Sequence, residues 1–322
     1  MQKVTRKMLV EKACELIKSG VADRCLAWKR GEFSYDVTPF VFNSQEEIDK
    51  DLVFNDFCGV NLSKYLIKET EKEGRVLVFL KPCDSYSFNQ LQTEHRLNRD
   101  NVYIVGVACD GMLDINEIKA RTDDAITAIE SNGESITVKC LGGDIVFERA
   151  ELLSQRCKSC KSKHIVAYDE IIGENADTQE SERFREVERI EAMTPDERFL
   201  FWQGELSRCI RCNACRDVCP ACTCEKCVFD NPKSGFENKA AADSFEEKMF
   251  HIIRAFHVAG RCTDCGECSR ACPQNIPLHI LNRKFIKDIN SFYGEYQAGE
   301  TPNQRSPLVN YSKDDRDPNG GD

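Results

Sequence analysis

Cysteines are the residues through which this sequence could do chemistry. There are 19 of them among 322 residues, and two groups of four share one spacing, with gaps of two, two and three residues and a proline directly after the fourth cysteine. The first group is Cys209, Cys212, Cys215 and Cys219, and the second is Cys262, Cys265, Cys268 and Cys272. A pattern of this length that occurs twice indicates that both groups bind the same kind of metal centre.

The spacing within each group suits a 4Fe-4S cubane. Three thiolates separated by two residues each wrap a tight loop around one cubane, whereas the fourth, followed by proline, reaches the neighbouring cubane. We therefore predict that one cluster is held by Cys209, Cys212, Cys215 and Cys272, and the other by Cys262, Cys265, Cys268 and Cys219. Structural zinc is the alternative, but zinc favours two separated cysteine pairs over a run of four with a trailing proline.

Four further cysteines follow predicted strands in the first half of the chain. Cys83 comes soon after the apolar run 76–80, Cys109 comes soon after the run 102–107, and Cys157 and Cys160 follow a predicted hairpin. Because the carboxyl ends of neighbouring parallel strands form the crevice where open α/β sheets bind ligands, Cys83 and Cys109 are expected to converge. From spacing alone, a metal site and buried free thiols both stay open.

The elements that must position these first cysteines form an α/β domain with a mainly parallel sheet, predicted over residues 1–173. The continuous apolar runs 76–80 and 102–107 are typical of buried strands, and the helical stretch 85–96 joins them into a strand–helix–strand unit. The other predicted elements are an amphipathic helix that ends at Gly20, a helix capped by Ser44, and a hairpin of 135–141 and 144–148.

The second half of the chain is predicted to be mostly helical. Residues 174–193 have the composition of an acidic linker or an exposed helix. The run from Thr194 to Glu197 supplies an N-cap, a proline and a reciprocal glutamate, so a helix leads into the two-cluster ferredoxin-like domain, predicted over 194–289. Residues 290–322 turn to Gly, Pro, Asn and Asp, and we expect an extended or disordered tail that suits a partner surface.

Composition excludes several classes of function. The formal net charge of -10 argues against nucleic acid, which requires clustered Lys and Arg. No apolar stretch approaches the roughly 18 to 20 residues that cross a bilayer, and the mean hydropathy is -0.47. The first 20 residues carry no uninterrupted apolar core of the secretory type, and an odd number of cysteines does not suit a disulfide framework. We therefore expect a cytoplasmic protein whose thiols bind metal.

The surroundings of the first four cysteines resemble a known family. A Pro-Cys after one strand, a Gly-Val-x-Cys at the next, and a later Cys-x2-Cys followed by an acidic residue and Ile-Gly are similar to the beta subunits of deazaflavin-reducing hydrogenases and dehydrogenases. The whole architecture also resembles the iron–sulfur subunits of soluble sulfhydrogenases and of anaerobic sulfite reductase. The resemblance implies a third 4Fe-4S cluster, held by Cys83, Cys109, Cys157 and Cys160.

The chain departs from these relatives at two places. Deazaflavin-reducing subunits begin with a glycine-rich segment associated with flavin, whereas residues 7–23 of this chain contain only Gly20, which argues against a bound flavin. Sulfhydrogenase-like subunits carry a Cys-x-Cys soon after the second strand cysteine. This chain has Met112, Leu113 and Asp114 there.

The remaining cysteines have no motif that assigns them. Cys222, Cys224 and Cys227 either bind a further metal with a distant partner such as Cys58 or pack beside the first cluster. Cys14, Cys25 and Cys140 are expected to behave as small apolar residues.

The insertion between the two cysteine groups carries a predicted helix capped by Ser244, and we interpret this helix as a packing element. Several arginines interleave with the ligands, namely Arg208, Arg211, Arg216, Arg261 and Arg270. Their alternative roles are to favour the reduced cluster, to dock an acidic partner, or simply to face solvent.

No dinucleotide fingerprint and no paired-carboxylate or His-Asp-Ser constellation is present, so the cofactors would carry the chemistry. We predict an electron-transfer subunit, itself non-catalytic, that relays electrons through 4Fe-4S clusters within an anaerobic oxidoreductase complex. The resemblance implies a complex of the hydrogenase, heterodisulfide-reductase or sulfite-reductase type, in which one partner is a flavin or pyridine-nucleotide subunit. The alternatives are a flavin-containing subunit that exchanges hydride with a soluble carrier, and a zinc-stabilised scaffold.

Overall fold

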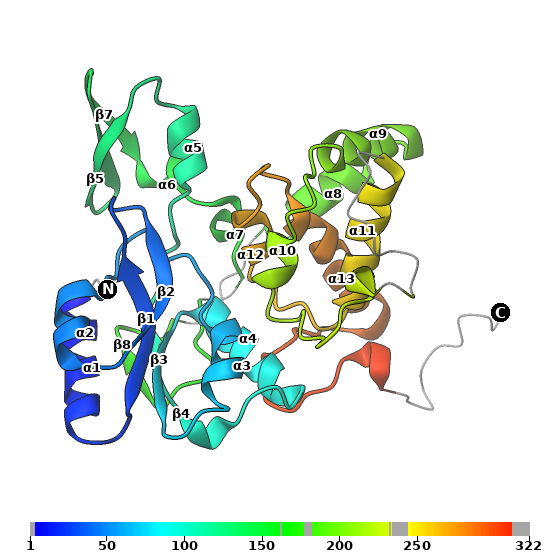
Figure 1. Cartoon of the computed structure of the whole chain (residues 1–322). Coiled ribbons are helices and arrows are strands. Elements are labelled where there is room, and N and C mark those ends of the chain that lie inside the picture. Colours follow the sequence, from blue (N-terminus) through cyan, green and yellow to red (C-terminus); the bar gives the residue numbers. More distant parts are fainter. Residues whose placement is uncertain (1–3, 162, 177–181, 232, 234–243, 311–322) are drawn as a thin grey trace. The chain divides into compact units, whose positions relative to one another are not determined.

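The computed structural model describes residues 4–161, 163–176, 182–231, 233 and 244–310, with the backbone alone described for 244–247. The chain divides into two compact units (Figure 1). Unit 1 comprises residues 1–88 and 97–181, and unit 2 comprises 89–96 and 182–322. Helix α4, Pro82–Thr93, contributes its first residues to unit 1 and its last residues to unit 2.

A five-stranded mixed sheet forms the centre of unit 1, in the order β2-β1-β3-β4-β8. Its strands are β1 (Arg24–Arg30), β2 (Val37–Phe42), β3 (Val76–Leu80), β4 (Val102–Val107) and β8 (Glu170–Ile172). Neighbouring strands from β1 to β8 pair in parallel, and only β2 pairs antiparallel, at one edge. The expected α/β fold with a mostly parallel sheet is thus confirmed, while β1, β2 and β8 were not predicted.

Helices lie on both sides of this sheet, with α1 and α2 on one side and α3 and α4 on the other (Figure 1). Their bounds are α1 (Arg6–Lys18), α2 (Gln45–Asp51) and α3 (Leu66–Glu69). Helix α1 ends as predicted, because Gly20 adopts a φ of 73° and the N–H of Val21 returns to the carbonyl of Leu16 at 3.0 Å. Ser44 caps α2 by accepting the Glu47 N–H at 3.2 Å.

A second, antiparallel sheet in unit 1 has the order β5-β6-β7. Its strands are β5 (Ile126–Asn132), β6 (Ser135–Cys140) and β7 (Gly143–Glu148), and the short helices beside it are α5 (Ile115–Ala120), α6 (Arg149–Leu152) and α7 (Gln155–Lys158). The β6–β7 hairpin is confirmed. Ile136, Val138 and Leu152 form its small core, so the outer face of β7 stays largely exposed.

Unit 2 is built from helices. They are α8 (Arg185–Glu191), α9 (Pro195–Leu206), α10 (Ala214–Asp217), α11 (Ser244–His257), α12 (Glu267–Arg270) and α13 (Leu278–Tyr293). The capping box predicted at Thr194 is present, since Glu197 N–H donates to the Thr194 hydroxyl and the Glu197 carboxylate accepts from the Thr194 backbone. The cap expected at Ser244 lies outside the described side chains.

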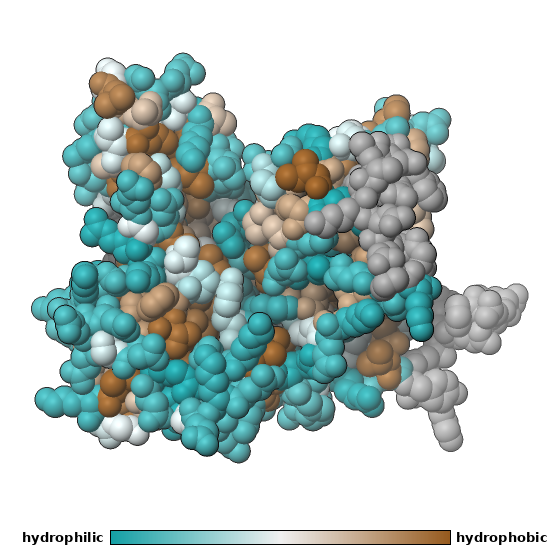
Figure 2. Space-filling model, in the orientation of Figure 1, coloured by the Kyte–Doolittle hydropathy of each residue, from teal (hydrophilic) through white to brown (hydrophobic). Residues whose placement is uncertain are grey.

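Residues 294–310 pack within unit 2. The Tyr296 hydroxyl donates to the Gly260 carbonyl at 2.9 Å, and the Asn89 side chain donates to the Gly299 carbonyl at 3.1 Å. A 3₁₀ turn over Pro307–Val309 follows. No helix among the described residues is long and apolar enough to cross a membrane. The face of the molecule in Figure 2 is mostly hydrophilic, with small hydrophobic patches between polar residues.

Candidate iron–sulfur centres

The two cysteine groups of unit 2 adopt the same local backbone. In the first group Arg211 and Asn213 have positive φ, at 53° and 63°, and the matching positions of the second group, Asp264 and Gly266, have 60° and 67°. Each group then runs into a one-turn helix, α10 or α12. Alternation of left- and right-handed residues turns successive N–H groups inward, which forms the anion-binding concavity known as a nest.

This shape carries a conformational cost that a bound anion would offset. A left-handed residue other than glycine costs about 1 to 2 kcal/mol, and three of the four positions are not glycine. The inward N–H groups meet sulfur: Arg211 N–H donates to Cys209 Sγ at 3.4 Å, and Asp264 N–H makes the equivalent bond to Cys262. Such bonds stabilise a thiolate and tune the potential of a cluster.

The fourth cysteine of the first group lies with the second group. Cys219 forms a small buried cluster with Val258, against which Cys262 packs. Burial, and then the charges of Asp264 and Cys219, raise the pKa of the Cys262 thiol. Cys219 is likewise an electrostatic neighbour of Cys265. Cys219 is therefore a neighbour of the second cysteine group, the position that the predicted crossing requires.

The fourth cysteine of the second group lies with the first group. Cys272 shares a hydrophobic cluster with Cys215, and Cys209 packs against the same cluster. Burial, and then the neighbouring thiols Cys268, Cys272 and Cys212, raise the pKa of Cys215 to about 11. Cys215 thus has two cysteines of its own predicted set as neighbours, together with Cys268 of the other set.

Among the described residues, no three His, Cys, Asp or Glu side chains are grouped closely enough to bind one metal ion. A cubane distributes its four thiolates over four irons, so its ligands stand farther apart than those of a single ion. Buried cationic groups beside the thiols also lack partners: Nε and Nη1 of Arg254 have no hydrogen-bond acceptor. A sulfur-rich anion would supply those acceptors, so the residues present fit two 4Fe-4S clusters.

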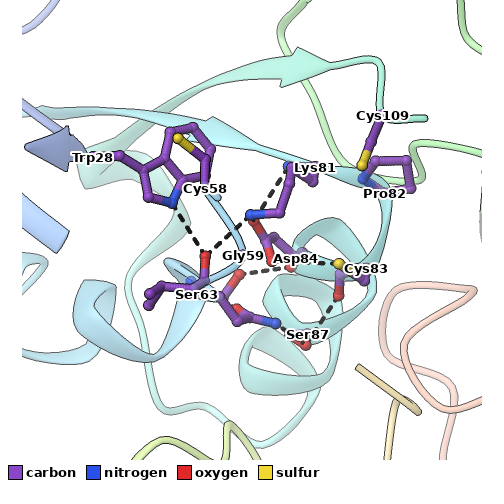
Figure 3. A network of polar contacts seen from close by, with 12 residues as sticks. Trp28, Cys58, Gly59, Ser63, Lys81, Pro82, Cys83, Asp84, Ser87 and Cys109 are labelled. Atoms are coloured by element: carbon purple, nitrogen blue, oxygen red, sulfur yellow. Dashed lines mark hydrogen bonds and ion pairs between the residues drawn. The ribbon is translucent and has the colours of Figure 1, made fainter. Parts of the chain in front are cut away.

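In unit 1 three cysteines of the predicted third set converge. Cys83 lies in the first turn of α4, and Cys109 follows β4 (Figure 3). Burial and then the Asp84 charge raise the pKa of Cys83, and Cys109 raises it further. Burial, and then the neighbouring Cys157, raise the pKa of Cys109 to about 11.

Backbone N–H groups also face these sulfurs. Gly111 N–H donates to Cys109 Sγ and Met112 N–H donates to Cys157 Sγ, both at 3.4 Å. The fourth predicted residue, Cys160, follows Cys157 in a turn in which its own N–H donates to the Cys157 carbonyl at 3.4 Å. The backbone N–H···S hydrogen bonds of the unit 2 cysteine groups thus recur in unit 1, around cysteines that come from separate elements.

A buried lysine stands beside these thiols. Lys81 is 1% exposed, and its Nζ donates to Asp84 at 2.8 Å and to the Val60 carbonyl at 3.0 Å (Figure 3). It also lies 4.3 Å from the centroid of the Trp28 ring. Burial alone would lower the pKa of Lys81, but the charges of Asp84 and Cys83 raise it overall. Lys81 therefore remains a cation next to the cysteines.

Cys58 is a further thiol at this site that the sequence does not assign there. It is fully buried, Asn55 N–H donates to its sulfur at 3.3 Å, and it is an electrostatic neighbour of Cys109. Burial raises the pKa of Cys58 to about 12. Cys58 belongs to no spaced motif, so the sequence gives no signal that places it beside Cys109.

An open cavity of about 660 Å³ adjoins Cys109. Its lining carries charges of both signs: Arg6, Arg149 and Lys163 on one hand, and Asp56, Asp110 and Glu134 on the other. Arg149 is paired with Asp56 at 2.8 Å, and Lys163 donates to the Cys109 carbonyl at 3.3 Å. A volume of this size is typical of small-molecule sites.

The unassigned cysteines of unit 2 have different surroundings. Cys222 packs beside Cys219, Cys227 packs at the edge of the cluster that contains Phe229, and Cys224 is exposed. Cys25 and Cys140 are buried in hydrophobic cores, and half-buried Cys14 packs against one, as expected for small apolar residues. Their structure supplies no motif for a further metal.

Comparisons with known proteins agree with this picture. A family described as a 4Fe-4S dicluster domain matches residues 205–276. The F420-dependent formate dehydrogenase subunit beta of Methanocaldococcus jannaschii is 27% identical over 92% of each chain. The F420-dependent formate dehydrogenase 1 subunit beta of Methanococcus maripaludis is 23% identical over 66% of this chain and 71% of its own.

One solved structure, the F420-reducing [NiFe] hydrogenase complex from Methanosarcina barkeri, aligns with a TM-score of 0.38 at 15% identity, over 48% of this chain and 59% of that one. That likeness is too weak to support an argument about the fold. The sequence relatives confirm the resemblance that the cysteines predict: the chain is a homologue of F420-dependent formate dehydrogenase beta subunits and is similar to deazaflavin-related iron–sulfur beta subunits.

Proposed function

We propose that this chain is an iron–sulfur electron-transfer subunit of an anaerobic oxidoreductase complex, and that unit 2 holds its two 4Fe-4S clusters. The observation that carries the proposal is the repeated nest, with the trailing cysteine of each group packed against the other group. When bound, each cluster takes up and releases one electron. The protein fixes the ligands, shields them from water and directs N–H groups at the sulfurs.

This packing supports the ligand sets that the spacing predicts. One cluster is assigned to Cys209, Cys212, Cys215 and Cys272, and the other to Cys262, Cys265, Cys268 and Cys219. Because each cluster is held by both cysteine groups, the loss of one trailing cysteine should be felt in the opposite loop. The two centres are therefore part of one folding unit with their metal.

We further propose that unit 1 holds a third 4Fe-4S cluster, with Cys83, Cys109, Cys157 and Cys160 as its ligands. Its support is the convergence of three of these thiols and the two N–H···S contacts at Cys109 and Cys157. Lys81 and Arg156 lower the pKa of Cys83 against the effects of burial and Asp84, so positive charge faces the place where an anionic cluster would lie.

The partners are other redox subunits. The sequence relatives are named as beta subunits of F420-dependent formate dehydrogenases, so this chain should also assemble with a catalytic partner and with a flavin or pyridine-nucleotide subunit. Hydrogenase-like and heterodisulfide-reductase-like subunits are the partner classes that the family resemblance implies. No two of the 19 cysteines are joined by a disulfide. Thiolate ligands need a reducing compartment, so we place the protein in the cytoplasm.

A second candidate function rests on the cavity beside Cys109. A flavin in that cavity would make the chain a subunit that exchanges hydride with a soluble carrier, and Arg6, Arg149 and Lys163 would face its anionic groups. Acid extraction of the anaerobically purified protein, followed by flavin fluorescence, decides between the two. Stoichiometric flavin would favour this second function, and its absence favours the relay.

Electron counting tests the relay directly. In a coulometric titration of the anaerobic, flavin-free protein, each 4Fe-4S cluster accepts one electron. We expect three electrons per chain, reversibly returned to an artificial one-electron acceptor. Two electrons would remove the unit 1 cluster from the proposal, and none would contradict it altogether.

A further inference from the structure

Helix α11 brings an arginine into the interior of unit 2. The helix packs against α9 and α13 (Figure 1), and Phe250 on its inner face lies in the same hydrophobic cluster as Cys215 and Cys268. One turn further on, Arg254 is only 3% exposed. A guanidinium at such depth is costly, because removal of a charge from water carries a penalty of several kcal/mol unless another charge compensates it.

The neighbours of Arg254 are thiols from both predicted ligand sets. Those that raise its pKa, against the opposing effect of burial, are Cys268, Cys215, Cys219 and Cys222, in that order. Cys215 belongs to one set, while Cys219 and Cys268 belong to the other. The guanidinium also donates a hydrogen bond to Cys268. Arg254 therefore has thiols of both predicted ligand sets as neighbours.

No carboxylate of the described residues balances this charge. In the described part of the chain no carboxylate lies within ion-pairing distance of Arg254, and its Nε and Nη1 have no hydrogen-bond partner. By contrast, Arg283 is equally buried and is paired with Asp264 at 2.8 Å. Arg254 is thus a buried cation with donors to spare.

The adjacent His251 does not supply the missing charge either. Neither ring nitrogen has a hydrogen-bond partner, and burial followed by the charges of Arg254 and Arg211 lowers the pKa of His251 to about 3. Arg211 itself lies over the Phe250 ring, 4.0 Å from its centroid. The local environment is therefore positive before any metal is bound.

We propose that Arg254 is a shared counter-cation of the two clusters in unit 2, with its free donors directed at their sulfurs, and that it raises the reduction potentials of both. The inference rests on the proposed function. A cluster with four thiolates is anionic and gains one further negative charge on reduction, so a buried cation stabilises the reduced state more than the oxidised state. Arg254 acts through the clusters and is a positioning and tuning residue.

Arg254→Met tests this assignment in the full chain, because methionine keeps much of the length and removes the charge. In a potentiometric titration followed by EPR, the reduction potentials of both unit 2 clusters should fall. The expected fall is at least tenfold in the equilibrium constant for reduction, which is about 59 mV for a one-electron couple. Arg254→Lys, which keeps the charge, should stay within threefold of the wild type. Iron and sulfide are measured on every variant.

The matched control is Lys248→Met on the same helix. Lys248 lies over the Phe199 ring at 4.6 Å and is six residues from Arg254, about 9 Å along the helix axis. Because its charge is partly solvated and screened, its removal should leave the potentials within threefold of the wild type. A Lys248→Met shift as large as that of Arg254→Met would overturn the specific role of Arg254.

The remaining outcomes also decide the inference. Arg254→Met protein with full iron and unchanged potentials overturns the inference while leaving the proposed function intact. If Arg254→Met loses iron but Arg254→Lys keeps it and its potentials, the charge is essential and the inference stands. Loss of iron in both variants overturns the inference, because it shows that the shape of the guanidinium, not its charge, is required. Wild-type protein without iron would instead contradict the proposed function.

Discussion

The cysteines of the two units reach their positions by different means. In unit 2 three thiols of each group lie within seven consecutive residues, and left-handed residues such as Asn213 and Gly266 shape the loop around them. In unit 1 the thiols come from separate elements: Cys83 and Cys109 follow the parallel neighbours β3 and β4, and α7 brings Cys157 beside Cys109. A local sequence builds the first kind of site, and a fold builds the second.

The compensation of charge differs in the same way. The cation of unit 1, Lys81, is held by Asp84 and the Val60 carbonyl. The cation of unit 2, Arg254, has no carboxylate among the described residues and is surrounded by thiols. The site of unit 1 is therefore electrostatically prepared by the protein alone, whereas that of unit 2 depends on its metal.

The largest effect should come from breaking the crossing in unit 2. Cys219→Ala is expected to remove about four irons per chain and to abolish the EPR signal of the cluster in the Cys262 loop, because Cys219 packs with that loop. Cys224→Ala, at an exposed cysteine nearby, should keep all the iron. Loss of the signal assigned to the Cys209 loop alone would contradict the crossing.

Cys109→Ala should break the site of unit 1 and spare unit 2. We expect the loss of about four irons and of one EPR component, while both signals of the dicluster domain persist, since the two sites share no ligand. Cys140→Ala serves as the control, because Cys140 is buried in the small core beside β6. Unchanged iron in Cys109→Ala would show that no cluster is held there.

Lys81→Met sharpens the comparison of charges. It leaves Asp84, which is fully buried, without its cation, and should destabilise unit 1 by about 3 to 5 kcal/mol. The urea midpoint reports this loss through Trp28 fluorescence in a Trp202→Phe background. The double variant Lys81→Met/Asp84→Leu should recover most of the stability. A single variant as stable as its parent would mean that the pair is not needed.

The smallest effect is expected at the start of the helix that leads into the first cysteine group. Thr194→Ala removes the cap of α9 and should cost about 1 kcal/mol, seen as a fall of a few degrees in the melting temperature. Thr194→Ser keeps the hydroxyl and should melt near the wild type. Equal melting of the alanine and serine variants would show that the clusters, not the cap, hold this helix in place.

The sequence predicts the features that depend on neighbouring residues. The runs at β3 and β4, the hairpin, the cap at Thr194 and the repeat are all local patterns, and each matches the structure. Strands β1 and β8 escape prediction because one is a four-residue apolar run between charged ends and the other has three residues. Both are strands because of their sheet neighbours.

The site residues divide along the same line. The spacing alone leads to the eight cysteines of unit 2, and Cys219 and Cys272 each pack with cysteines of the opposite group. The position of Cys58 beside Cys109 depends on how a distant loop folds. Arg254 belongs to no motif in the sequence, and only the packing of α11 shows that it is buried.

Quantitation of iron and acid-labile sulfide, with EPR spin counting of the reduced protein, tests the central claim most directly. The account predicts about twelve irons and twelve sulfides per anaerobically purified chain, with two interacting clusters from unit 2 and a third from unit 1. About eight would contradict the cluster of unit 1. Fewer than eight, or a colourless protein that contains zinc, would contradict the assignment of the repeat itself.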